Sequence, residues 1–197
     1  MNELYVKALG IHGAVMEFGV RWGQNLALLS TLRNIYEPHN YNRKIIGFDT
    51  FEGFTGVSSQ DGTARSVQTG GYGVTEGYES YLEDVLATHE QLAPRSHIRR
   101  FELVKGDVTQ TVPQYLERHP ETVVALAYFD MDLYKPTKDV LLSIKDRLTK
   151  GSIIGFDEVG VAEFPGETLA LKETFGLSRY SLHRSPLSYH QSYIVYE

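Results

Sequence analysis

The chain has 197 residues, 42% hydrophobic and 12% aromatic, which is enough for one domain with a full core and too few for two. Its net charge of -6, without any Lys/Arg-rich block, argues against nucleic acid or an anionic membrane as a partner and favours a small molecule. The absence of cysteine excludes disulfides, thiolate zinc sites and a cysteine nucleophile. No apolar run could span a bilayer and the start, MNELYVKALG, lacks the plan of a signal peptide, so we expect a cytoplasmic protein.

Segments with strand character alternate with segments of helical periodicity along most of the chain. The strand-like segments are rich in Val, Ile, Phe and Leu and lie at 14–20, 44–50, 101–107, 123–130 and 152–157. Segments with apolar residues three and four positions apart lie between them, at 25–36, 81–92, 112–118 and 137–148. This alternation predicts parallel βαβ units, with right-handed crossovers that place helices on both faces of one sheet.

The pattern changes after Glu158. A helix is predicted at 167–175, followed by two strand-like segments at 179–184 and 191–196 that are polar and close in sequence. They predict an antiparallel hairpin at one edge of the sheet. The expected fold is therefore α/β, a doubly wound and mostly parallel sheet with an antiparallel C-terminal edge hairpin, in a single domain spanning 1–197.

Residues 52–77 form a long segment that is rich in Gly, Ser and Thr and shows neither a helical nor a strand periodicity. Loops of this length in compact domains are usually functional or disordered. We favour a lid over an unstructured insertion, because the segment leaves the ligand-facing end of its strand. Phe54, Tyr72 and the pair Gly70-Gly71 suit a flap that closes over a ligand.

Carboxylates end two of the predicted strands. Asp130 and Asp132 close the segment VVALAYFDMDLY, and Asp157 and Glu158 close SIIGFDEV. In an open α/β sheet, ligands bind at the carboxyl ends of the strands, so these four acids are expected to converge. Oxygen-only ligands favour Mg²⁺, Mn²⁺ or Ca²⁺ over zinc.

The first strand–loop–helix unit reads EFGVRWGQN, from Glu17 to Asn25. Gly19 and Gly23 permit a tight turn and close backbone approach, and the helix that follows directs its first amide donors at whatever binds in the loop. The loop therefore indicates a nucleotide-like ligand, although its spacing is not that of the dinucleotide fingerprint G-x-G-x-x-G.

Acids also end the next two strands. Asp49 is placed to bind both hydroxyls of a ribose, and Asp107, after Gly106, could accept from an adenine amine. Each acid alone could equally be a helix N-cap. Together with the glycine loop they indicate a nucleotide cofactor.

Several fragments resemble one known family, the macrocin O-methyltransferases, which are metal-dependent enzymes that methylate sugar hydroxyls with S-adenosylmethionine. The fragments span about Gly13 to Glu167 and are EFGVRWGQN, GFDTFEGF, FELVKGDVTQTVP, YFDMDLYKPT and GSIIGFDEVGVAEFPGE. The resemblance implies the seven-stranded sheet of class I methyltransferases, with the last strand antiparallel.

The resemblance also implies roles for individual residues. The implied cofactor contacts are Glu17, Gly19, Gly23, Asn25, Asp49, Thr50, Gly106, Asp107 and Val108. The implied ligands for Mg²⁺ or Mn²⁺ are Asp130, Asp157 and Glu158. Asp130 and Asp132 lie two residues apart, on the same side of an extended strand, and are the candidate catalytic residues, with Asp130 as ligand and possible base. Asp132 has an alternative role as a cap of the following helix.

The second acidic pair departs from the family pattern, in which Asp-Asp is usually followed by Tyr. Here the sequence is Asp157-Glu158-Val159, and the extra methylene of glutamate displaces its carboxylate. Neighbouring strand residues point to opposite faces, so both acids can bind one metal only if the chain turns at Asp157. Gly160 suits such a turn.

Methyl transfer requires mainly that an acceptor oxygen be aligned with the methyl group and its pKa lowered, which a carboxylate-bound cation can do. Two other readings stay open. Tyr134-x-x-x-Lys138 is a spacing used by nicotinamide-dependent reductases, although Pro136 is expected to disturb the helix that would hold it. The second alternative is a protein that keeps the fold and the cofactor pocket but binds the cofactor without catalysing transfer.

The acceptor is also open: a nucleotide-linked sugar, a sugar on a natural product and a surface glycan all fit the resemblance. The sequence also leaves the oligomeric state open, since the lid or the edge hairpin could pair subunits in a homodimer or a higher homo-oligomer.

Overall fold

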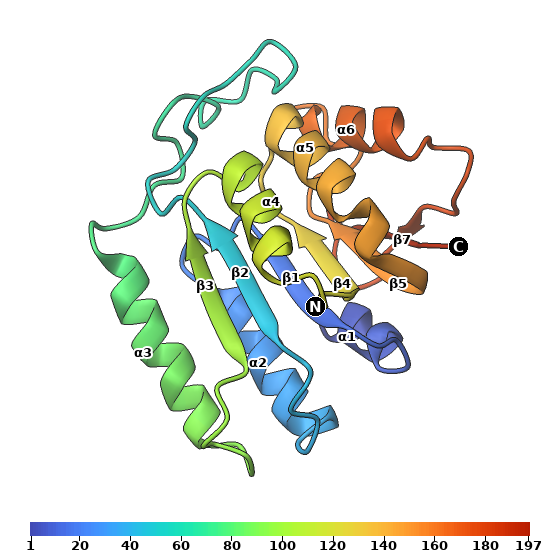
Figure 1. Ribbon diagram of the computed structural model, residues 1–197. Coiled ribbons are helices and arrows are strands. Elements are labelled where there is room, and N and C mark those ends of the chain that lie inside the picture. Colours follow the sequence, from blue (N-terminus) through green and yellow to red (C-terminus); the bar gives the residue numbers. More distant parts are fainter.

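A seven-stranded sheet in the order β3-β2-β1-β4-β5-β7-β6 forms the centre of the computed structural model, which describes residues 1–197 (Figure 1). The strands are β1 (Ala14–Phe18), β2 (Ile45–Asp49), β3 (Phe101–Lys105), β4 (Val124–Phe129), β5 (Leu148–Phe156), β6 (His183–Arg184) and β7 (Ser192–Val195). Strands β1 to β5 are parallel, and β7 runs antiparallel to both β5 and β6. The predicted mostly parallel sheet with an antiparallel C-terminal hairpin is confirmed.

Helices cover both faces of this sheet. They are α1 (Asn2–Ala8), α2 (Gln24–Tyr36), α3 (Tyr78–Gln91), α4 (Val108–Arg118), α5 (Tyr134–Ile144) and α6 (Gly166–Thr174), with a 3₁₀ turn at Lys145–Arg147. Side chains of α4, α5 and α6 join one apolar core and those of α1, α2 and α3 join the other. No helix is both long and apolar enough to cross a bilayer.

Two helices that start earlier than predicted, and one helix that was not predicted, have identifiable physical reasons. Helix α4 begins at Val108 instead of 112, because the Asp107 side chain accepts from the Thr109 amide and caps the helix. Helix α1 was not predicted, since seven residues are too few to show a periodicity. Helix α5 begins at Tyr134 and runs through Pro136, so the expectation that this proline disturbs the helix is wrong: in the first turn its missing N–H has no intrahelical partner to lose.

A row of four phenylalanines crosses the sheet close to the carboxyl ends of its central strands. Phe48, Phe18, Phe129 and Phe156 come from β2, β1, β4 and β5, and successive ring centroids are 5.2, 5.0 and 5.3 Å apart. All four side chains are fully buried. Close packing of this kind gives the loops that follow these strands a rigid base.

The 52–77 loop lies beyond the carboxyl ends of these strands, in teal and green at the top of Figure 1. Backbone hydrogen bonds join its two limbs: the Phe54 amide donates to the Gly71 carbonyl (3.0 Å) and the Gly70 amide to the Phe54 carbonyl (2.9 Å). The rings of Phe54 and Tyr72 also meet edge to face at 5.4 Å. The loop is thus built from specific turns instead of being an unstructured insertion.

Candidate active site

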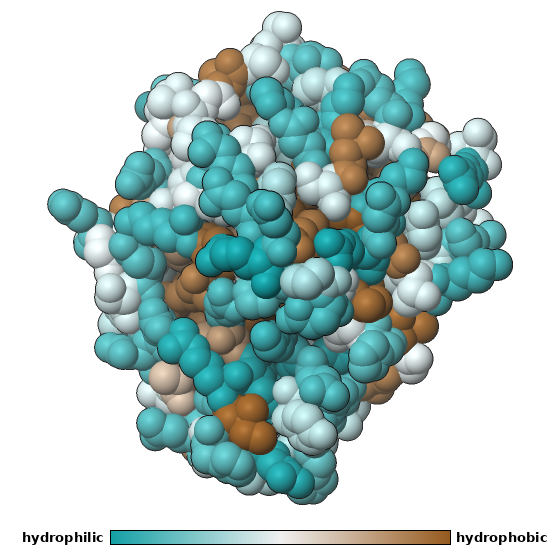
Figure 2. Space-filling model, in the orientation of Figure 1, coloured by the Kyte–Doolittle hydropathy of each residue, from teal (hydrophilic) through white to brown (hydrophobic).

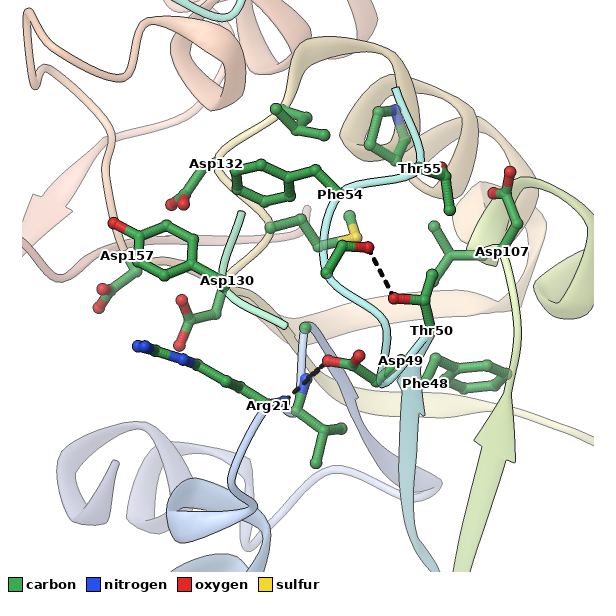
Figure 3. Close-up of a pocket in the computed structure, with 18 of the residues that line it drawn as sticks. Arg21, Phe48, Asp49, Thr50, Phe54, Thr55, Asp107, Asp130, Asp132 and Asp157 are labelled. Atoms are coloured by element: carbon green, nitrogen blue, oxygen red, sulfur yellow. Dashed lines mark hydrogen bonds between the residues drawn. The ribbon is translucent and has the colours of Figure 1, made fainter. Parts of the chain in front are cut away.

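A cavity of about 300 Å³ opens at the carboxyl ends of β1, β2, β4 and β5, beneath the 52–77 loop (Figure 3). Ten of the residues predicted for the site line it: Gly19, Asn25, Asp49, Thr50, Asp107, Val108, Asp130, Asp132, Asp157 and Glu158. Three predicted cofactor contacts, Glu17, Gly23 and Gly106, do not. The loop adds Gly53, Phe54, Thr55 and Tyr72 to the wall.

The two glycines of the first loop are required by packing within the protein. Gly19 has φ +90, and a Cβ there would lie 1.9 Å from the Asp130 carbonyl oxygen. Gly23 has φ +76, precedes α2, and would collide with Leu82 if it carried a side chain. Gly19 therefore lets the glycine loop and the acidic end of β4 share one wall of the cavity, whereas Gly23 lies behind it.

Glu17 is the most unusual acid near the cavity. It is 1% exposed, and neither of its carboxylate oxygens has a hydrogen-bond partner. Burial, reinforced by the charge of Asp130, raises the pKa of Glu17 well above its ordinary value. Because an unpaired buried acceptor is costly, this carboxyl next to Asn25 and Asp130 fits a binding site for a cationic or donor group of a ligand.

Asp49 binds the protein backbone as well as lining the cavity. Its Oδ2 accepts from the amides of Val20 (2.7 Å) and Arg21 (2.8 Å) (Figure 3). Its Oδ1 accepts from the Phe51 amide (2.6 Å). This carboxylate therefore joins the glycine loop to the start of the 52–77 loop. Asp107 is likewise both a helix cap and a lining residue, so the two readings of that acid are compatible.

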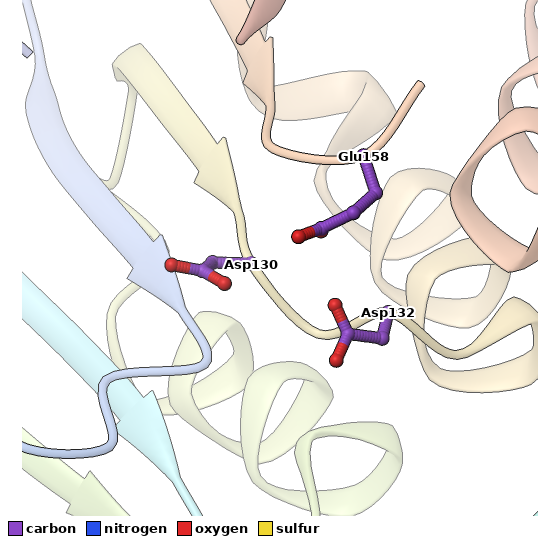
Figure 4. A group of neighbouring side chains, drawn as sticks. All are labelled: Asp130, Asp132 and Glu158. Carbon is purple, nitrogen blue, oxygen red and sulfur yellow. The ribbon is translucent and has the colours of Figure 1, made fainter. Parts of the chain in front are cut away.

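Three carboxylates from two strand ends form a compact group. Ligand oxygens of Asp130, Asp132 and Glu158 lie within 4.8 Å of one another (Figure 4). Asp157 lies outside the group, because its Oδ1 accepts from the Tyr128 hydroxyl (2.6 Å), which in turn accepts from Gln191 (2.9 Å). Of the three predicted metal ligands the structure thus brings Asp130 and Glu158 together, with Asp132 beside them.

The chain does make the turn that the second acidic pair requires. Strand β5 ends at Phe156, residues 157 and 158 bend away, and Gly160 adopts φ +87. Glu158 consequently points towards Asp130 and Asp132 (Figure 4). Asp157 instead binds the Tyr128 hydroxyl of β4.

The electrostatics of this group suit a cation. Burial, then the charges of Asp157 and Asp132, raises the pKa of Asp130 to about 8. Burial and the nearby Glu167 raise the pKa of Glu158 to about 12, and burial raises that of Asp132. One Glu158 oxygen is buried without a partner. Clustered, mutually repelling carboxylates with a free oxygen fit a hard divalent ion, which would relieve the repulsion.

Asp132 does not cap α5, so that alternative role is wrong. The amide of Tyr134, the first residue of α5, donates instead to Oδ1 of Asp61 in the 52–77 loop (2.6 Å). Asp61 is 2% exposed, and its other oxygen accepts from the amide and hydroxyl of Ser58. The sequence shows Asp61 only as a loop acid, because its partner is 73 residues away.

Glu167 is a second residue that sequence reasoning placed only in a first helical turn. It is fully buried, and its two oxygens accept from the amides of Met131 (3.2 Å) and Glu158 (3.2 Å). The carboxylate therefore connects the two acidic strand ends.

Strained backbone gathers around the cavity. Four non-glycine residues have positive φ: Arg21 (50), Phe51 (58), Tyr72 (59) and Asp132 (60). Three of them line the cavity and Phe51 follows Thr50, which also does. Arg21 packs its guanidinium over the Tyr72 ring at 4.6 Å, linking the glycine loop to the 52–77 loop. Clustered strain of this kind is characteristic of functional sites.

The Tyr134 and Lys138 pair belongs to a different network. Lys138 donates to the Tyr134 hydroxyl (2.8 Å) and both contact Glu173 of α6, but neither residue lines the cavity. The pair therefore joins α5 to α6. It cannot act as the catalytic Tyr-Lys pair of a reductase in this cavity, so the reductase hypothesis has no support in the structure.

A seven-stranded sheet with an antiparallel penultimate strand, and a cavity between a glycine loop and an acidic strand end, define a class I O-methyltransferase that depends on S-adenosylmethionine. Residues 3–171 match the family described as Macrocin-O-methyltransferase (TylF), and the chain belongs to that family.

Solved structures agree with this assignment. The calicheamicin methyltransferase CalS11 is 44% identical with a TM-score of 0.97, over 99% of this chain and 76% of that one. An apo structure of CalS11, described as a TDP-rhamnose 3'-O-methyltransferase, is 42% identical with a TM-score of 0.87, over 100% and 76%. The O-methyltransferase NovP shares the fold at 17% identity, with a TM-score of 0.72 over 98% and 76%. None of the curated protein sequences compared with the chain matches it.

Proposed function

We propose that this enzyme transfers the methyl group of S-adenosylmethionine to a hydroxyl of a sugar, carried by a glycoside, a nucleotide sugar or a natural product, with the help of Mg²⁺ or Mn²⁺. The observation that carries the proposal is one cavity with the glycine loop and Asp49 on one side and three clustered carboxylates on the other. The 44% identity to CalS11, a calicheamicin methyltransferase, supports a sugar acceptor.

The cofactor half of the site comprises the ends of β1, β2 and β3. Asn25, which lines the cavity, and Glu17, a buried acceptor without a partner that lies behind it, are assigned to the cofactor ammonium. Asp49 is assigned to the ribose hydroxyls and Asp107 to the adenine amine, since both line the cavity. The other assigned contacts are Gly19, Gly23, Thr50, Gly106 and Val108, of which Gly23 and Gly106 act through loop geometry.

The reactive half of the site comprises the ends of β4 and β5. Asp130, Asp132 and Glu158 are the geometrically favoured ligands, and Asp157 could join them if its bond to Tyr128 were released. A bound divalent ion would supply a Lewis acid that lowers the pKa of the acceptor hydroxyl. Asp132 is the assigned base in the state in which Asp130 and Glu158 hold the ion, and Asp130 is the alternative base.

The 52–77 loop is assigned the role of a lid. Phe54 and Tyr72 line the cavity from above, and an apolar cover of this kind excludes water during transfer. A cavity of about 300 Å³ beneath such a cover suits a small molecule. Membership of this family supports a biosynthetic role, which we place in the cytoplasm.

Transfer of a labelled methyl group tests this function. We expect S-adenosylhomocysteine to raise the Tm of the protein, and label to pass to TDP-rhamnose or to a natural-product rhamnoside, with activity lost after EDTA and restored by Mg²⁺. Asp130→Asn should bind S-adenosylhomocysteine but lose the response to Mg²⁺, while the matched surface variant Asp139→Asn behaves as wild type. Full activity after EDTA would remove the metal from the proposal, and stabilisation by NADPH but not S-adenosylhomocysteine would overturn it.

A further inference from the structure

We propose that Glu167 is a positioning residue, which holds the two acidic strand ends at the separation that lets one divalent cation contact both. This proposal rests on the proposed function, because it concerns the cation site. Glu167 lies outside the cavity wall and acts through the backbone of the residues that carry the ligands.

The geometry at Glu167 is a bridge between two chain segments. Oε1 accepts from the amide of Met131, the residue between Asp130 and Asp132, and Oε2 accepts from the amide of Glu158, each at 3.2 Å. The last sheet hydrogen bond between these segments runs from the Asp157 amide to the Phe129 carbonyl (3.0 Å). Beyond that bond, Glu167 links the backbones of the two ends through its side chain.

Only a carboxylate can make this bridge in its present form. Both partners are N–H donors, so the side chain must offer an acceptor at each end. Glutamine offers one acceptor and one donor, and its NH₂ group would face an amide N–H of one strand end. Placing a fully buried carboxylate among three other acids is unfavourable, so its presence needs a reason beyond stability.

The surroundings of Glu167 make the bridge rigid. Gly166, the first residue of α6, is so close to the β4 end that a Cβ would lie 2.3 Å from the Asp132 carbonyl oxygen. Thr168 accepts from the Gly160 amide (2.9 Å) and so holds the far end of the Glu158 segment. The first turn of α6 thereby contacts both acidic segments through three successive residues.

The test is the affinity for Mn²⁺, measured by electron paramagnetic resonance on the full chain, together with calorimetric binding of S-adenosylhomocysteine. Glu167→Gln is expected to weaken Mn²⁺ binding roughly tenfold or more and to leave S-adenosylhomocysteine binding within about twofold of wild type, which also shows that the variant is folded. Amide hydrogen exchange should increase in 129–134 and 157–161. Glu117→Gln, the same chemical change at an exposed position of α4, should change none of these.

Unchanged Mn²⁺ affinity or unchanged exchange in Glu167→Gln would overturn the positioning role. If Glu167→Gln does not fold, Thr168→Val removes only the Gly160 contact and should weaken Mn²⁺ binding about threefold; wild-type affinity in that variant would also count against the proposal. If wild type itself binds no Mn²⁺, the metal in the proposed function fails. Hydrogen exchange in Glu167→Gln then decides whether the bridge holds the two segments together.

Discussion

Several residues near the cavity have pKa values or backbone angles that differ from those of the same residues in a solvated, unfolded chain. Asp130, Glu158 and Glu17 have raised pKa values through burial and mutual repulsion, and Asp132 also has a strained φ of +60. Each condition costs stability, and all of them lie at one end of the sheet. The groups that destabilise the folded state therefore lie where a bound cofactor and a bound cation would offset their free-energy cost.

This predicts an unusual dependence of stability on pH. The pKa of Asp130 is about 8 in the folded chain against a reference value of 3.8, so between these values the folded state binds the extra proton. Stability from this group is therefore complete below about pH 4 and is lost as the pH rises through about 8. We expect the Tm of the metal-free protein to fall between about pH 5 and pH 8.5, and Mg²⁺ to restore it at the upper end.

The matched measurement is the same Tm series on Asp130→Asn, which should show a flatter curve and little response to Mg²⁺. A Tm that rises with pH over this range in the wild type, or the same slope in both proteins, would contradict the assignment.

The sequence was most informative about the acids that line the cavity. The acids after β2, β3, β4 and β5 could be placed at one sheet edge, because parallel strands bring their carboxyl ends together. It was silent about Asp61 and Glu167, because each binds a backbone amide far along the chain. Nor could it show that Asp157 turns towards Tyr128, which depends on where β5 ends.

At the scale of elements, the 52–77 loop is attached to the helix that follows the acidic end of β4. Asp61 caps α5 through the Tyr134 amide, and Gly62 packs against the Glu163 carbonyl, where a Cβ would lie only 2.4 Å from the oxygen. The loop is therefore connected to both sides of the cavity, through Arg21 and Tyr72 on one side and Asp61 on the other.

We predict that Asp61→Ala loosens this attachment. Loss of a helix cap costs about 1–2 kcal/mol, which urea unfolding can measure. Because the cover would open more often, the KM for the acceptor should rise several-fold, by more than kcat falls. Glu76→Ala, an exposed change in the same loop, is the control; an unchanged KM in Asp61→Ala would argue that the loop is not a lid.

Most elements could be predicted because their apolar residues follow a strand or helix period. The five parallel strands and α2 to α6 were found with boundary errors of a few residues, and the hairpin was found although β6 has only two residues. Helix α1 was missed, and the 52–77 loop could be recognised only by its lack of pattern. Its path depends on contacts with α5 and the glycine loop.

Across the whole molecule, the candidate active site and a buried cluster of ion pairs lie at opposite ends of the sheet. At the amino end of β3, Glu90 accepts from both Arg33 (2.9 Å) and Arg100 (2.6 Å), and all three side chains are buried. These ion pairs connect α2, α3 and β3 without contributing to the cavity.

Removing the shared carboxylate should therefore affect stability alone. Glu90→Ala leaves two buried guanidinium groups without their partner, and we expect a loss of about 3–5 kcal/mol in the free energy of unfolding. Glu83→Ala, which removes the exposed pair with Arg99 on the same helix, should cost at most about 1 kcal/mol. Folded Glu90→Ala at low temperature should keep the wild-type affinity for S-adenosylhomocysteine; a weakened affinity would show that the two ends of the sheet are coupled.

The fit of Gly19 against the Asp130 carbonyl has a consequence for the timing of turnover. The two loops that would hold methyl donor and acceptor rest on the same row of phenylalanines and cannot move apart without breaking sheet hydrogen bonds, such as that from the Asp130 amide to the Phe18 carbonyl (2.9 Å). The donor and acceptor sides therefore behave as one rigid unit. Entry of substrates and release of products must then depend on movement of the 52–77 loop. The slow step of the cycle is accordingly expected to respond to solvent viscosity.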